Sequence, residues 1–296
     1  MPSVEDPGLK FVKANSSWQP LAIRRLPPLP AAELSVIPGK TTMKTFSWGF
    51  LQEFYGGKQW SPSFYYVPPS HGKVLLPSRS WYGIDAKYEP YMPHSPGAHG
   101  AKLTAFFNPD SPEDVHGDEN GNSLHNVPLF ISASNWATDL PEKQYVYFGM
   151  YSQLRFSDKL DYERMVESVP HEVKMYWAEQ LSSPARPEWV TDQLKKHFFP
   201  KPEYQGHLPG PDVDSCVVRS DFAEYRRELQ EWESDASMVA GSLSKEEILQ
   251  AFEQEDANEP RGLRLWWEYL QCIGWDSGFY HMLLKAQGRY CKSVHL

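Results

Sequence analysis

Hydrophobic residues follow two different spacings along the chain, and the spacing changes near residue 160. Before that point, short apolar or alternating runs are bounded by prolines and glycines, which is typical of strands. We expect strands at residues 64–67, 73–76, 102–107, 127–132 and 145–156. Gly149 interrupts the last of these runs and indicates a bulge.

After that point, apolar residues recur at helical spacing. Pro170 marks a helix start, Ser244 and Glu247 form a capping-box signature, and Asp276 caps a last helix. We expect helices at residues 162–181, 187–199, 220–232, 245–254 and 277–287, and an earlier one at 45–55. Residues 263–275 have instead the spacing of a buried strand, which most simply returns to the earlier sheet.

These patterns predict an α+β fold, with a bent β-sheet or β-barrel core and with peripheral and C-terminal helices. The chain divides into a Pro-rich extended arm (residues 1–40), a β-rich core (41–160) and a helix-rich part (161–296). Because the strand at 263–275 returns to the core, we expect the last two parts to form one compact unit.

The chain is acidic, with a formal net charge of -9, and the acidic excess lies in residues 161–296. A strongly basic nucleic-acid module is therefore not expected, although a local basic groove stays open. The three cysteines form no CxxC pair, which favours a reducing compartment over a disulfide framework. The sequence has no signal-like apolar segment and no run of about 20 apolar residues. We expect a soluble nuclear or cytoplasmic protein with no membrane partner.

The arm carries one recognisable string, RRLPPLP, at residues 24–30. Prolines at this density pre-form a polyproline II helix, and Arg24 is placed to pair with an acidic rim, as in ligands of SH3 domains. The alternative is a stiff segment that packs on its own domain. The sequence leaves both interpretations open.

Catalytic motifs are absent from the sequence: it has no nucleophile elbow, zinc-protease helix or phosphate-binding loop. His94 and His99 lie five residues apart, but no cysteine or carboxylate pair beside them completes a metal-ligand set. We therefore assign no catalytic residue, cofactor or metal.

The best candidate site is aromatic and surrounds the loop YEPYMPHSPGAHGAK at residues 88–102. A pocket for a planar group needs rings for stacking, glycines for close backbone approach and a polar group to read an edge. A stacked base contributes about 1–3 kcal/mol. The predicted ligand-binding residues are Trp81, Tyr82, Asp85, Tyr88, Tyr91, His94, Gly97, His99, Gly100, Trp136 and Tyr147. Arg79, Lys87 and Lys102 are the predicted phosphate contacts. The alternative is that the aromatic residues fill the core and the loop is a rigid connector.

The order of several motifs resembles an uncharacterised fungal, basidiomycete-type domain family of unknown function. These motifs are YGG (55–57), PYMPHSPGAHG (90–100), PLFIS (128–132), YVYFGMY (145–151), VKMYWAEQL (173–181) and WEYLQCIGWDSGFYHMLLKA (267–286). The resemblance spans roughly residues 42–285 and implies no established activity.

A second resemblance rests on residues 94–100, HSPGAHG, and residues 145–151, YVYFGMY. They are similar to the loop and strand of PUA-like domains, including SRA-type and EVE-type readers of modified bases. This resemblance implies a PUA-like β-barrel core and a flipped base read in an aromatic pocket.

Three functions follow as hypotheses. The first is a non-enzymatic intracellular binding protein that reads a modified or flipped nucleobase in DNA or RNA. The second is a protein–protein interaction module that uses the Pro-rich arm and the acidic helical half. The third is an enzyme of unfamiliar type that uses the same aromatic pocket.

Overall fold

The computed structural model describes residues 19–76, 78–117, 122–132, 143–154, 158–211, 214–258 and 261–294. The predicted site residue Trp136 lies outside these ranges. The chain divides into two compact units, Met1–Lys159 with Leu265–Leu296 and Leu160–Arg264. Among the described helices, none has the length and apolar character needed to cross a membrane.

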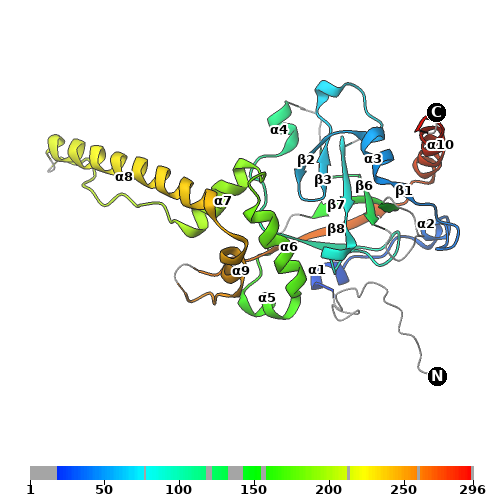
Figure 1. The fold of residues 1–296 in the computed structure, drawn as a ribbon, viewed down its shortest axis with the longest axis horizontal. Helices are drawn as coiled ribbons and strands as arrows, with labels where there is room; N and C mark the ends of the chain where they lie inside the picture. The colour runs from blue at the N-terminus through cyan, green and yellow to red at the C-terminus, as the bar shows by residue number, and fades with distance from the viewer. Residues whose placement is uncertain are drawn as a thin grey trace. The chain divides into compact units, whose positions relative to one another are not determined.

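The first unit is built on one eight-stranded sheet, which Figure 1 shows in cyan, green and orange. Its strands are β1 (Phe46–Ser47), β2 (Lys58–Ser61), β3 (Phe64–Tyr66), β4 (Ser80–Ile84), β5 (Gly100–Thr104), β6 (Val127–Ser132), β7 (Gln144–Leu154) and β8 (Trp266–Gly274). Their order is β2-β3-β4-β6-β7-β8-β5, with β1 also paired to β7. Only the β4–β6 pair is parallel among the described pairs.

The sheet curls into a half-barrel, which confirms the predicted α+β fold with a bent sheet core. Register shifts interrupt the pairs β2–β3, β6–β7 and β7–β8. Gly149, with φ +122°, lies at the β6–β7 shift, where a side chain would be 2.8 Å from the Gly274 carbonyl oxygen. Bulges of this kind increase strand twist and bend a sheet.

The strand predicted at residues 73–76 is wrong, because these residues form a loop and the next strand is β4. Arg79 explains the loop. Its guanidinium donates to the carbonyls of Val67 (2.7 Å), Pro68 (2.7 Å) and Gly72 (2.9 Å), and its own φ is +54°. The side chain thus holds the backbone between β3 and β4 in a turn.

The helices of the first unit include α1 (Leu21–Arg24), α2 (Ala31–Ser35), α3 (Trp48–Tyr55), α4 (Pro112–His116) and α10 (Ser277–Val294). The Ser47 hydroxyl caps α3 by accepting from the Phe50 N–H, and the Asp276 carboxylate accepts from the Phe279 N–H at the start of α10. Helices α3 and α10 contact each other, with the Phe50 and Tyr290 rings 5.8 Å apart.

The second unit holds α5 (Tyr162–Ser168), α6 (His171–Ser182), α7 (Glu188–Phe198), α8 (Ser215–Ser242) and α9 (Lys245–Glu253). The predicted capping box at Ser244 and Glu247 is present. Helix α8 extends well beyond the predicted 220–232, because Asp214 caps it earlier, accepting from the Cys216 N–H (2.8 Å). The buried Arg264 guanidinium binds the carbonyls of Phe252 and Gln254 and the Asp256 carboxylate.

Two glycines of the first unit differ in the space around them, and replacing each by alanine tests the packing there. At Gly100 a Cβ would lie 2.3 Å from Pro93 Cδ, whereas at Gly288, inside α10, nothing lies within 4 Å. We expect Gly100→Ala to destabilise the unit by about 1–3 kcal/mol through overpacking. Gly288→Ala should stabilise it by about 0.5–1 kcal/mol, because alanine is the better helix former. Chemical denaturation measures both changes, and equal effects would contradict the observed packing.

Candidate functional site

The proline- and histidine-rich loop between β4 and β5 is fixed to its surroundings through His99. The Cys272 N–H donates to His99 Nδ1 (3.0 Å), so the ring proton belongs on Nε2, which lies 2.8 Å from the Pro27 carbonyl and donates to it. The ring therefore joins the loop, strand β8 and the arm.

Gly97 is a second anchor of the loop. Its N–H donates to the Phe148 carbonyl (2.9 Å), and its φ of +85° suits glycine. A Cβ there would lie 2.8 Å from Ile37 and 3.0 Å from Leu34, which belong to the arm. Leu29 is buried beside them. The described arm residues thus pack on their own domain through this face, while Arg24, Pro27 and Pro30 are exposed.

The aromatic residues of the predicted pocket contribute to the core. Trp81, Tyr82, Tyr91 and Tyr147 are each 5% exposed or less. Trp81 stacks on Tyr65, with ring centroids 4.4 Å apart, and Tyr91 packs edge-on against Trp267 at 4.9 Å. Tyr147 lies among Trp275, Phe279 and Tyr280. These four rings therefore offer no open face for stacking.

The remaining predicted residues lie in two settings. Asp85 caps a short 3₁₀ turn and accepts from the Ser132 hydroxyl (3.1 Å) and from Lys143. His94 and Lys87 are exposed, and the Lys87 ammonium lies 5.0 Å from the centre of the half-buried Tyr88 ring. Of the predicted phosphate contacts, Lys102 is buried, the half-buried Arg79 binds backbone carbonyls, and Lys87 is exposed.

Lys102 belongs to a buried polar cluster inside the half-barrel. Its ammonium, 1% exposed, lies 3.0 Å from Glu268 Oε2, and the Tyr82 hydroxyl donates to Glu268 Oε1 (3.0 Å). Glu89, 6% exposed, accepts from the Leu103 N–H (2.9 Å). The cluster therefore holds two carboxyl groups and one ammonium, and its residues come from β4, β5, β8 and the loop between β4 and β5.

Glu89 ionises with difficulty in this setting. Burial raises the pKa of Glu89 to about 8. The Glu268 carboxylate adds to this rise, whereas the Lys102 ammonium and the Leu103 N–H oppose it. In the unfolded chain the pKa of a glutamate is near its ordinary value of about 4.3. Between these values the folded protein holds a proton that the unfolded chain has lost.

Folding stability should therefore decline as the pH rises through this window. The contribution of Glu89 is complete below about pH 4.3 and is lost as the pH rises to about 8, at up to about 1.4 kcal/mol per pH unit. Glu89→Gln mimics the protonated form and should remove this slope. Denaturation at several pH values measures it, with Glu53→Gln, an exposed glutamate on α3, as the control. Parallel pH profiles for wild type and Glu89→Gln would contradict the assignment.

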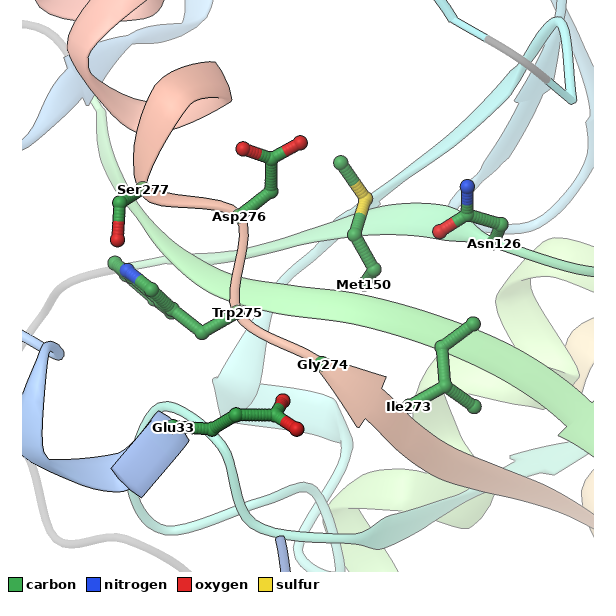
Figure 2. Close-up of a pocket in the computed structure, with 8 residues that line it drawn as sticks. All are labelled: Glu33, Asn126, Met150, Ile273, Gly274, Trp275, Asp276 and Ser277. Carbon is green, nitrogen blue, oxygen red and sulfur yellow. The ribbon is translucent and has the colours of Figure 1, made fainter. Parts of the chain in front are cut away.

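An open pocket lies where β8 ends and α10 begins (Figure 2). It has a volume of about 380 Å³ and is lined by Glu33, Asn126, Met150, Ile273, Gly274, Trp275, Asp276 and Ser277. Figure 2 shows the Glu33 and Asp276 carboxylates on either side of the Gly274–Trp275 backbone. None of these eight described residues is basic. The pocket therefore suits a cationic group better than a phosphate.

The residues that line the pocket come from segments far apart in the sequence. Asp276 is the N-cap of α10, a role that its place before a helical pattern predicted. Glu33 comes from α2 in the arm, and its carboxylate lies 3.4 Å from the position of a Cβ at Gly274. No spacing in the sequence links residue 33 to residues 274–277. None of the described site residues that the sequence predicted lines this pocket.

One further polar pair stands beside the pocket. The Ser152 hydroxyl on β7 lies 2.6 Å from His125 Nδ1, and His125 is exposed. In the described part of the chain, no group of three or more His, Cys, Asp or Glu residues is arranged to hold a metal ion.

Comparison with known proteins is consistent with an uncharacterised family. No curated protein and no solved structure matches the chain. Residues 45–286 match the family model described as a domain of unknown function, DUF6697. This range takes in the half-barrel strands, the buried cluster and every pocket residue except Glu33. The chain therefore belongs to the DUF6697 family.

Proposed function

We propose that the domain is a protein-interaction module that binds a basic side chain of a partner polypeptide in the pocket of Figure 2. The observation that carries this proposal is the pair of carboxylates, Glu33 and Asp276, in one open pocket whose lining residues include no base. A lysine or arginine side chain that enters this pocket would form charge-assisted hydrogen bonds with the carboxylates of its lining.

Charge and shape favour the same ligand. The chain carries a net charge of -9, which attracts basic segments and repels polyphosphates. The volume of about 380 Å³ is at the lower end of ligand pockets and suits one side chain. The half-buried Ile273 and the buried Met150 and Trp275 supply an apolar wall for the methylene stem of that side chain.

The arm contributes directly to this function, since Glu33 lies on α2. Leu29, Leu34 and Ile37 fix this part of the arm against Gly97. Glu33 is therefore held in place before a ligand arrives, which reduces the entropy lost on binding. This role fits the hypothesis that the arm takes part in protein interactions.

Base reading and SH3 binding are the competing hypotheses. Base reading would need stacking faces, yet Trp81, Tyr82, Tyr91 and Tyr147 are buried. Docking of Arg24–Pro30 into an SH3-type groove would need both leucines of the string, and Leu29 is buried beside Gly97. Stacking on these four rings, or docking of this string, would therefore require part of the fold to open.

A double replacement tests the proposed site. Glu33→Gln with Asp276→Asn removes both charges, and asparagine retains the helix cap of α10. We expect the affinity for fluorescein-labelled Arg- and Lys-rich hexapeptides to fall by about twofold to thirtyfold, since each of the two ion pairs contributes about 0.2–1 kcal/mol. Fluorescence anisotropy measures the affinity, which should also weaken as salt is added.

The control is Glu53→Gln, which should bind as the wild type does. Basic peptides that bind both variants equally, or do not bind at all, would refute the proposal. A single-stranded oligonucleotide that binds more tightly than the peptides would favour base reading instead.

A further inference from the structure

Ser152 and His125 form a hydrogen-bonded pair of the kind that activates a serine. The distance from Ser152 Oγ to His125 Nδ1 is 2.6 Å. His125 lies at the end of a tight turn, where its N–H donates to the Asn122 carbonyl (3.2 Å). A serine hydroxyl within hydrogen-bond reach of an imidazole is the basic unit of nucleophilic catalysis.

The strand register places this pair at the margin of the pocket. Val127 pairs with Tyr151 at the end of the antiparallel β6–β7 ladder, and beyond it the Gln153 N–H donates to the Leu124 carbonyl (2.8 Å). His125 and Asn126 therefore lie across from Ser152. Asn126 lines the pocket, and Figure 2 shows its amide pointing toward Met150. Met150 precedes Ser152 by two residues, about 7 Å along the strand.

Asn126 supplies the third group that such chemistry needs. Its φ of +56° ends the ladder and turns the side chain amide to the pocket. A side chain amide can donate to the oxyanion that forms during acyl transfer. The hydroxyl on β7 therefore lies across from a base and an amide donor on the two residues that precede β6.

We propose that Ser152 is a nucleophile toward carboxylic esters, with His125 as its general base and Asn126 as the oxyanion donor. Ser152 Oγ attacks the ester carbonyl carbon, and its proton passes to His125 Nδ1. The tetrahedral intermediate collapses as the carbon–alkoxy bond breaks, and His125 returns the proton to the leaving alcohol. Water then hydrolyses the acyl-serine, with His125 accepting and returning one proton.

This activity goes beyond the proposed peptide binding and does not rest on it. Ser152 is 7% exposed, so the attack requires a small acyl group to enter beside Asn126. The ester carbonyl would be fixed by neutral groups, whereas peptide binding rests on the carboxylates of Glu33 and Asp276. The two proposals can therefore fail separately.

An uncharged alkyl fluorophosphonate is the test reagent, applied to the full chain and followed by intact mass and peptide mapping. We expect one adduct per chain, located on Ser152, and no adduct in Ser152→Ala. Labelling of His125→Asn should be about a hundredfold slower or more.

Ser132→Ala is the matched control. Ser132 is also a buried strand serine, but its hydroxyl donates to a carboxylate, Asp85, so this variant should keep the adduct at the wild-type rate. An unlabelled wild type, an adduct elsewhere than Ser152, or a His125→Asn variant with the wild-type rate would overturn the proposal. If Ser152→Ala does not fold, mapping of the wild-type adduct and the His125→Asn rate still decide.

Discussion

The ion pair between Lys102 and Glu268 is the contact on which the half-barrel depends. These residues are direct register partners in the β5–β8 pair, and both side chains are buried. Loss of one partner would leave an uncompensated buried charge, at a cost of about 3–5 kcal/mol. A slip of β8 by one residue would turn Glu268 to the other face of the sheet and leave Lys102 without its partner, so the pair fixes the register of the last strand. Tyr82 then joins β4 to the same carboxylate, although β4 and β8 are not neighbours in the sheet.

The aromatic residues fill the interior of the curled sheet and leave little open ring surface there. A curled sheet encloses a volume that large side chains must fill, and here rings from β3, β4, β6, β7 and α3 do so. The loop between β4 and β5 is part of this packing, since His99, Gly97 and Gly100 each make contacts that a different residue would break. Charged and polar groups line instead the open pocket at the start of α10.

The sequence predicted the elements whose signals are local. A short apolar run located β6, alternation located β7, and capping signatures located α9 and α10. It missed β4, because the five residues of this strand, SWYGI, do not alternate and Gly83 interrupts their short apolar run. It placed Lys102 at the surface, since a lysine is rarely buried without a partner and its partner lies at residue 268. The pocket was beyond prediction for the same reason: Glu33 and Asp276 are brought together only by the packing of the arm on the loop.

The strand order also has a consequence for synthesis. Strand β5 ends at Thr104 and its partner β8 begins at Trp266, with the whole second unit between them in the chain. At 5–20 residues per second, a ribosome needs roughly ten to thirty seconds to make that interval. Throughout it, the Lys102 ammonium has no Glu268 to pair with, and once β7 is made, the edge that β8 will occupy stays open. The nascent chain must keep this edge and β5 from pairing wrongly until the last strand emerges.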